Sequence, residues 1–464
     1  PNVHICPVCM AHPGTLPVIN REAVRSVLKV GVALGATLAD YTEFDRKNYF
    51  YPDLPKGYQL SQYEYPLVSG GELGGVAITR VHLEEDTASS MHEDPSTGSG
   101  QGGMTTIDYN RAGVPLMELV TEPVITSAAQ AGNFARELQL LLRCLGASEA
   151  NMEKGEMRVE ANISVSKISN GKNKILGTKV EIKNLNSFRA MERAVLYEIK
   201  RQTELLLRGE KVIQETRGWD EAKQSTFVQR TKEGSADYRY FPDPDLPSLR
   251  LSEVSEFSKE SLEKEMPELP WERRERYERL GIKKDDARLY VQEPALGGFF
   301  EEVLGLLGGD TARPTDGGAR ILLASNYIAN DLVKLMRDIE GRDSGYQDEM
   351  PISAKNFKEI IDMLAEGKIS SRAAKDILAA CVKGGADEPR RYAEAQGLLK
   401  AGGSTLEGVV KEVIANNPKV AADFRAGKGA ALEFLVGQCM KALRGAGDPA
   451  ALRELLKKNI KNLG

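Results

Sequence analysis

Residues 157–165 read MRVEANISV and residues 178–183 read TKVEIK, and these two segments decide the fold. In both, apolar side chains alternate with polar or charged ones, which is the period of a β-strand that buries one face. The Asn170-Gly171 step between them is typical of a hairpin turn. The sequence therefore predicts two paired antiparallel strands.

The polar faces of these strands gather side chains of unlike charge. A solvated sheet face accounts for this, and so does the floor of an open polar cavity. The residues concerned are Arg158, Glu160, Asn162, Glu181 and Lys183.

Apolar residues at helical spacing surround the two strands. Residues 21–34 form one such segment, with Gly35 as a stop signal, and residues 134–142 form a second that ends at Gly146. A third helix is predicted to follow Ser187, a candidate N-cap. This part of the chain therefore mixes α and β structure.

The composition turns to Glu, Lys and Ser between residues 249 and 270, which indicates a domain boundary. From Trp271 onwards the pattern is almost wholly helical, with helices expected at 327–337, 354–365, 371–382, 405–414, 430–443 and 450–460. We predict an α+β fold: a mixed α/β domain with a largely antiparallel sheet (1–252), an all-α helical domain (253–398) and a small helical tail (399–464).

The net charge of −5, from 62 Lys plus Arg and 67 Asp plus Glu, excludes a globally basic nucleic-acid binder. Residues 400–464 nevertheless carry 11 basic and 6 acidic side chains, so this end is +5 and the remainder −10. A basic tail on an acidic body is expected if the tail contacts a phosphate backbone. A basic surface without a partner explains the charge equally well.

Two features bear on the compartment. The longest near-apolar run, residues 30–39, is far below the ~20 residues that span a bilayer, so no membrane segment is expected. Five scattered cysteines favour a reducing compartment. Because the first residue is Pro1, a targeting peptide would be invisible.

Familiar catalytic motifs are missing: the sequence has no HExxH, no GxxxxGK[ST] and no GxSxG. It does contain one Cys-x-x-Cys pair, Cys6 and Cys9. Two thiolates at this spacing can hold one Zn²⁺, but a structural zinc site needs four ligands. The pair is therefore interpreted as half of a zinc site or as a vestige of one.

Carboxylates cluster after a strand-like stretch at residues 76–83. Glu84, Glu85 and Asp86 follow it directly, and Glu118 follows Pro115. Carboxylates held close together repel one another unless a hard cation such as Mg²⁺ neutralises them, and such a cation is what phosphoryl transfer requires. The alternative is a group of surface acids at a strand end.

Two segments, residues 44–59 and 237–245, combine aromatic, charged and proline residues. Stiff loops of this kind belong to functional sites or interfaces, or they form structural corners.

Several of these stretches together resemble a known family, in order along nearly the whole chain. They are CPVC (6–9), FDRKNYFYPDLPKGYQ (44–59), HLEED (82–86), DYNRAGVPLMELVTEP (108–123), EIKNLNSFRAMERAVLYEI (181–199), QETRGWDE (214–221), DYRYFPDPDLP (237–247) and FRAGKGAALEFLVGQCMKA (424–442). The chain resembles the B subunits of aspartyl/glutamyl-tRNA amidotransferases (the GatB/GatE family), and its end resembles that family's YqeY-type tail.

The resemblance implies an ATP-dependent ligase subunit of protein biosynthesis. In this family a kinase-like cradle domain, here residues 1–252, phosphorylates Glu or Asp on mischarged tRNA(Gln) or tRNA(Asn). Ammonia from the glutaminase partner, the A subunit, then amidates it, and a small C subunit completes the heterotrimer. ATP and Mg²⁺ are the implied cofactors, with Zn²⁺ as a further candidate.

The resemblance also implies roles for single residues. Glu85 and Glu118 match the Mg²⁺ ligands, and Lys47 and Lys56 match lysines along the ammonia route. Arg158 and Glu160 fall on the floor of the cradle, where relatives have Asp in place of Glu160. Further metal ligands of the family, a Glu-x-His pair, would precede Pro1. Candidates for tRNA contact are Arg425, Lys428 and Lys441.

The competing hypothesis is a non-catalytic subunit that binds tRNA or supports assembly. The sequence does not separate Asp-tRNA from Glu-tRNA as substrate, and it leaves the nucleotide-contacting residues open. The expected compartment is the bacterial cytoplasm, with an organelle as the alternative.

Overall fold

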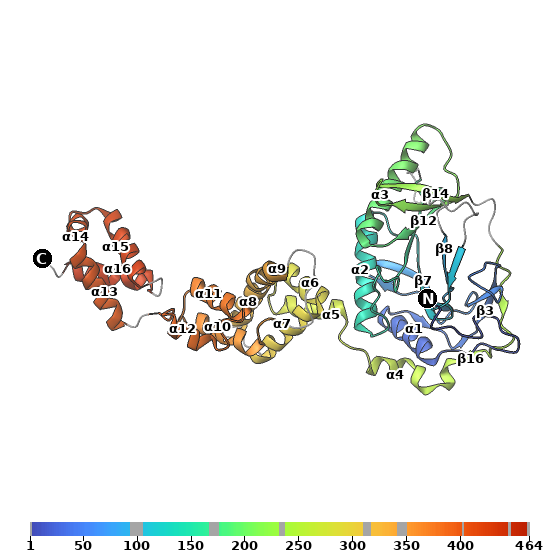
Figure 1. Ribbon diagram of the computed structural model, residues 1–464, viewed down its shortest axis with the longest axis horizontal. Helices are drawn as coiled ribbons and strands as arrows, with labels where there is room; N and C mark the ends of the chain where they lie inside the picture. The colour runs from blue at the N-terminus through green and yellow to red at the C-terminus, as the bar shows by residue number, and fades with distance from the viewer. Residues whose placement is uncertain are drawn as a thin grey trace. The chain divides into compact units, whose positions relative to one another are not determined.

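The computed structural model describes residues 2–92, 105–166, 176–231, 237–309, 317–340, 350–400, 403–443 and 447–461. The chain divides into two compact units, residues 1–270 and 271–464 (Figure 1). The first unit combines helices with sheets, and the second is helical. The predicted α+β class is confirmed, while the predicted three-domain division stays a prediction.

The first unit holds the strands. Their bounds are β1 Thr37–Leu38, β2 Tyr41–Thr42, β3 Asp45–Asn48, β4 Tyr58–Ser61, β5 Val68–Ser69, β6 Glu72–Leu73, β7 Val76–Glu85, β8 Ser89–His92, β9 Thr105–Asp108, β10 Pro115–Thr121, β11 Val159–Ile163, β12 Val180–Leu185, β13 Glu215–Asp220, β14 Ser225–Thr231, β15 Phe241–Pro242 and β16 Leu249–Arg250. Its helices are α1 Arg21–Ala33, α2 Ala128–Cys144, α3 Phe188–Leu207 and α4 Lys259–Lys264, with short turns η2 Leu251–Glu253 and η3 Ser255–Phe257.

Two larger sheets organise this unit. One has the order β1-β5-β7-β10, with β6 also paired to β7, and the other has the order β11-β12-β13-β14. Smaller ladders join β15-β3-β4, β16-β2 and β8-β9. The described pairs are antiparallel except β12–β13, which is parallel. The predicted strand pair is confirmed as β11 and β12, with Asn162 opposite Glu181. The Asn170-Gly171 step lies outside the described residues.

The helices form where their signals predict them. The Ser187 side chain accepts a hydrogen bond from the Ala190 backbone N–H and caps α3, as predicted. Helices α2 and α3 lie side by side, and α3 packs on β11, β12 and β14 (Figure 1). Their buried faces share an apolar core that includes Ile182 and Met191.

Helix α1 positions the first sheet. It packs against β5 and β7, and Val27 and Leu28 on the helix are fully buried. On β7 the apolar side chains of Val81 and Leu83 are buried as well. Because side chains alternate along a strand, the residues between them point to the opposite face. That second face of β7 is available for polar chemistry.

In the described residues of the second unit the named elements are helices, and one isolated β-bridge joins Ile369 to Leu399. The helices are α5 Pro270–Arg279, α6 Lys284–Gln292, α7 Pro294–Leu306, α8 Gly317–Asn326, the π-helical turn η5 Tyr327–Leu332, α9 Val333–Glu340, α10 Ala354–Ala365, α11 Ser371–Val382, α12 Pro389–Ala395, α13 Gly403–Asn416, α14 Pro418–Arg425, α15 Gly429–Ala442 and α16 Pro449–Lys461. One hydrophobic core runs from Tyr277 to Ala393, and a separate one runs from Leu406 to Ile460. Within the described ranges, no helix is long and apolar enough to cross a membrane.

Candidate functional site

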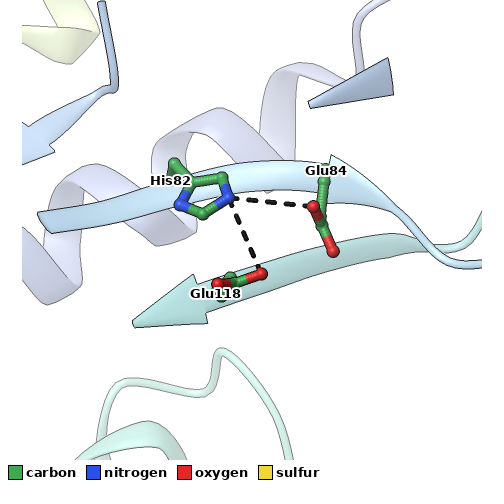
Figure 2. Close-up of side chains that lie close together, drawn as sticks. All are labelled: His82, Glu84 and Glu118. Atoms are coloured by element: carbon green, nitrogen blue, oxygen red, sulfur yellow. Dashed lines mark ion pairs between the residues drawn. The ribbon is translucent and has the colours of Figure 1, made fainter. Parts of the chain in front are cut away.

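Strands β7 and β10 bring two distant segments of the chain together. They pair in antiparallel register, with Glu118 opposite His82 and Leu116 opposite Glu84. His82 and Glu84 are two residues apart on β7, so both point to the same face. Figure 2 shows these two side chains and Glu118 on one side of the strands. We refer to His82, Glu84 and Glu118 as the acid–histidine triad.

The donor atoms of the triad lie close enough to share one ion. His82 Nε2 is 3.7 Å from Glu84 Oε2 and 3.8 Å from Glu118 Oε2 (Figure 2). Two ligands that share a cation at about 2.1 Å stand about 3.0 Å apart when adjacent and about 4.2 Å when opposite. The two separations from His82 fall between these limits, and the three donor atoms lie within 4.8 Å of one another, which makes the triad a candidate site for a small divalent cation. His82 and Glu84 are buried, and Glu118, 45% exposed, leaves the site open on one side.

The charge state of Glu84 suits a metal ligand. Burial raises the pKa of this carboxyl, but His82 and the charge of Lys47 outweigh it and hold the pKa below its ordinary value. The Ser61 hydroxyl donates to Glu84 Oε2 at 3.0 Å, which fixes the carboxylate in place. Lys47 Nζ lies 3.7 Å from the same oxygen. The structure thus puts Lys47, a predicted site residue, beside the triad.

Two nitrogens on this face have no protein partner. Arg80 precedes His82 by two residues on β7, so it shares the face of the triad. Arg80 Nε and His82 Nδ1 are buried and make no hydrogen bond within the described part of the chain. Buried polar atoms are nearly always paired, so unpaired ones on one face point to a ligand or ion that completes the site.

Glu85 is not where the sequence prediction put it. It was expected to hold one cation together with Glu118, but as the next residue after Glu84 it points away from the triad. Its carboxylate accepts hydrogen bonds from Lys56 Nζ at 2.5 Å and from the Leu60 backbone N–H at 2.9 Å. The structure brings Glu118 to Glu84 and brings Glu85 to Lys56. The predicted pairing of Glu85 with Glu118 is therefore corrected.

Arg158 joins the second sheet to the end of β7. Its guanidinium nitrogen lies 2.7 Å from Asp86 Oδ2, and Arg111 Nε lies 2.8 Å from the same oxygen. Asp86 is buried, whereas both arginines are partly exposed. One carboxylate between two guanidinium groups leaves a local charge of +1, which suits an anionic ligand.

Glu160 lies on the polar face predicted for the strand pair. Lys183 on β12 reaches it across the sheet at 2.9 Å, and Lys183 Nζ is 3.8 Å from Glu181. Burial lowers the pKa of Lys183, but Glu160 and then Glu181 outweigh it, and the net effect raises the pKa. These side chains are partly open to solvent. Their role in a reaction stays a prediction.

Cys6 and Cys9 are free thiols in a tight turn closed by the Met10 backbone N–H donating to the Cys6 carbonyl at 3.0 Å. Backbone N–H groups, first that of Cys9, lower the pKa of Cys6, whereas burial raises the pKa of Cys9 to about 11. Among the described residues, neither cysteine belongs to a group of three metal-ligating side chains. A bound Zn²⁺ stays a prediction.

The three predicted tRNA-contacting residues are exposed on the helical tail. Arg425 ends α14, Lys428 precedes α15 and Lys441 lies in the last turn of α15. Lys428 Nζ forms an ion pair with Asp423 at 2.9 Å. Lys428 and Lys441 lie at opposite ends of a helix of 14 residues, about 20 Å long at 1.5 Å per residue. One compact phosphate group cannot engage both.

The sequence prediction did not include His82, Arg80 or Glu84, which the structure places on one face with Glu118. The signal was present in the alternation of residues 80, 82 and 84, which puts Arg, His and Glu on one face of a strand. It identifies a site only once the partner strand, which supplies Glu118, is known.

Comparison with known proteins identifies the family. The family model described as the GatB/GatE catalytic domain matches residues 1–256, which contain the triad, and the model described as the GatB domain matches residues 316–460. The chain belongs to the GatB/GatE family. This family membership confirms the resemblance inferred from the sequence motifs.

Curated relatives in this family match nearly the whole chain. A protein of Herminiimonas arsenicoxydans is 43% identical over 99% of this chain and 93% of its own length. A protein of Thermomicrobium roseum is 43% identical over 99% of this chain and 92% of its own length. Both are named as the B subunit of aspartyl/glutamyl-tRNA(Asn/Gln) amidotransferase. A relative from Sorghum bicolor is 39% identical over 99% of this chain and 82% of its own length. It is named as the chloroplastic/mitochondrial B subunit of glutamyl-tRNA(Gln) amidotransferase.

Proposed function

We propose that this chain is the B subunit of a glutamine-dependent tRNA amidotransferase. It uses ATP to phosphorylate the side-chain carboxylate of Glu or Asp esterified to a mischarged tRNA. Ammonia then replaces the phosphate and leaves Gln or Asn on the tRNA. The observation that carries the proposal is the acid–histidine triad, open beside Lys47, inside the domain that matches the family's catalytic model.

The chemistry explains the need for such a site. A carboxylate is a poor acceptor for ammonia because oxide is a poor leaving group. When its oxygen attacks the γ-phosphorus of ATP, ADP leaves and an acyl phosphate forms. The ammonia nitrogen then attacks the acyl carbon, inorganic phosphate departs, and the nitrogen loses a proton to form the amide.

The residues on the triad face have distinct tasks in this scheme. His82, Glu84 and Glu118 would hold a divalent cation, which when bound neutralises charge on the phosphate oxygens. Because one ligand is an imidazole, Mn²⁺ is a suitable alternative to the expected Mg²⁺. Lys47, 3.7 Å from Glu84, adds a positive charge beside the triad. Arg80, on the same face, supplies a guanidinium donor for an anionic substrate.

The partners follow from the division of labour in such enzymes. The proposed complex contains a glutaminase, the A subunit, which releases ammonia from glutamine, and a small C subunit. The pair of Lys56 and Glu85 lies on the opposite side of β7 from the triad, so it is available to ammonia arriving from there. The basic tail, with Arg425, supports tRNA binding. The proposed compartment is the bacterial cytoplasm, with an organelle as the alternative.

The test is ATP consumption by the assembled complex. We expect hydrolysis of ATP that depends on mischarged tRNA, formation of Gln-tRNA or Asn-tRNA, and loss of both when EDTA removes divalent cations. Glu-tRNA(Gln) and Asp-tRNA(Asn) are tested in parallel, because the proposed reaction applies to both. If the complex binds tRNA but never consumes ATP, the chain serves in binding or assembly, and the proposal fails.

A further inference from the structure

Five tyrosines form a continuous row beside the triad. Tyr51 contacts Tyr49 edge-on at 5.7 Å between ring centroids, and Tyr49 contacts Tyr238 in the same way at 5.9 Å. Tyr238 meets Tyr240 at 6.2 Å, and Tyr240 is stacked on Tyr63 at 4.7 Å with an interplanar angle of 13°. We call these five side chains the tyrosine row. It unites the two aromatic segments noted in the sequence.

The row is anchored to the triad. Lys47 Nζ is 3.7 Å from Glu84 Oε2 and 5.4 Å from the centroid of the Tyr238 ring, so this lysine touches both. The middle of the row therefore stands next to the proposed reaction centre.

The ends of the row are open. Tyr63 is 58% exposed although one face of its ring is stacked on Tyr240, and Tyr51 is 50% exposed. Tyrosines that only stabilise a loop are expected to bury their rings, since burial is the source of most of their stabilising energy. Exposed rings held rigid by a stack are the usual platform for unpaired nucleic-acid bases.

We propose that the tyrosine row binds the unpaired 3′ end of the substrate tRNA, with the terminal base stacked on the outer face of Tyr63. This inference rests on the proposed function. In that reaction the amino acid is esterified to the terminal ribose, so a carboxylate at the triad brings the last nucleotide into the same region of the molecule. The row provides aromatic surface in that region, since Lys47 contacts both Glu84 and Tyr238.

The number of bases favours the RNA end over the adenine of ATP. ATP presents one base, whereas an unpaired 3′ end presents several in succession, and the row offers separate open rings at Tyr51 and Tyr63.

The experiment measures RNA affinity, which needs no catalysis. The probes are two fluorescent RNA hairpins, one with an unpaired CCA 3′ end and one trimmed of its last two nucleotides, bound to the assembled complex. Tyr63→Ala is expected to weaken binding of the CCA hairpin by about 5- to 150-fold. The trimmed hairpin should bind wild type and variant alike, and the salt dependence should not change, because no phosphate contact is lost.

Two variants control for structural damage. Tyr63→Phe keeps the ring and should bind as wild type does. Tyr65→Ala removes another exposed tyrosine, which lies outside the row, and should have no effect. Tyr65 is 40% exposed and among the described rings is in edge contact with Tyr41 alone.

Three outcomes overturn the proposal: unchanged affinity in Tyr63→Ala, an equal loss for both hairpins, or a raised KM for ATP with unchanged RNA affinity. The last result assigns the ring to the adenine of ATP. If the wild-type complex consumes no ATP with mischarged tRNA, the proposed function fails, yet the comparison of the two hairpins still decides this inference.

Discussion

Glu84 and Glu85 are neighbours in the sequence but act in different places, because consecutive side chains on a strand point to opposite faces. Glu84 faces His82 and Glu118, and Glu85 faces Lys56. A motif of consecutive acids shows that carboxylates are present, and only the strand register shows which one faces the partner strand. The sequence predicted a cation held by Glu85 and Glu118, whereas the structure brings Glu84 to Glu118, and the bound cation itself stays a prediction.

This difference gives a direct test at the residue scale. Glu84→Gln should weaken Mn²⁺ binding to the assembled complex by more than about 10- to 100-fold, because even residues outside a metal's ligand set have effects of that size. Glu85→Gln is the matched control and should keep the affinity within about threefold. Calorimetric titration with Mn²⁺ measures both. Equal losses in the two variants would contradict the assignment of the triad.

Cys6 and Cys9 should differ in reactivity despite their spacing. Burial raises the pKa of Cys9 to about 11, while backbone N–H groups lower that of Cys6, so at neutral pH Cys6 supplies more thiolate. Iodoacetamide should modify Cys6 first near pH 7.5, and Cys9 only after unfolding or above about pH 10. Peptide mass spectrometry reads out each site, with the unfolded chain as control. Equal rates in the folded protein would disprove the difference.

At the scale of single elements, α3 is fixed to its sheet by buried charges. Glu198 is fully buried and accepts hydrogen bonds from Arg201 at 2.6 Å and from Gln202 at 2.9 Å. Arg217 on β13 lies 3.8 Å from the same carboxylate and 2.6 Å from Glu215. Removing one member of such a network leaves the others charged and poorly paired.

Glu198→Gln should therefore lower the free energy of unfolding of the first unit by about 3 kcal/mol. Glu204→Gln on the same helix is the control, because the ion pair of Glu204 with Lys200 is exposed and 3.9 Å long. This control variant should change the free energy of unfolding by less than about 0.5 kcal/mol. Urea denaturation followed by Trp219 fluorescence, in a Trp271→Phe background, reports on this unit. A small effect of Glu198→Gln would mean that the network relaxes around the neutral side chain.

Local sequence signals predicted individual helices and strands well, but they did not predict which distant strands pair. Helices 354–365 and 371–382 have the same bounds in the structure as in the prediction. The short helices α12 and α14, of 7 and 8 residues, were not predicted because they have too few turns to show a period. The pairing of β7 with β10 was not predicted either, since no local turn connects the two segments.

Charge is divided unevenly along the whole molecule. Residues 400–464 carry a net +5, while the rest of the chain carries −10. The helices of this end have a hydrophobic core of their own, from Leu406 to Ile460, so their fold depends on contacts among themselves. An acidic body repels RNA at long range, and a basic module with its own core can supply the attraction.

A chain that ends at Leu399 tests whether the tail supplies tRNA affinity. Assembled with its partners, it should bind tRNA more weakly and with a flatter dependence of log Kd on log salt, by about one unit of slope for each lost phosphate contact. Within the tail, Arg425→Gln should reduce affinity more than Lys428→Gln does, because Lys428 is already paired with Asp423 at 2.9 Å, and Arg425 has no ion pair among the described residues. Binding titrations at several salt concentrations measure both effects. If the shortened chain binds tRNA with the same affinity and the same salt dependence, the basic tail is a solvated surface. The first unit would then have to recognise the tRNA.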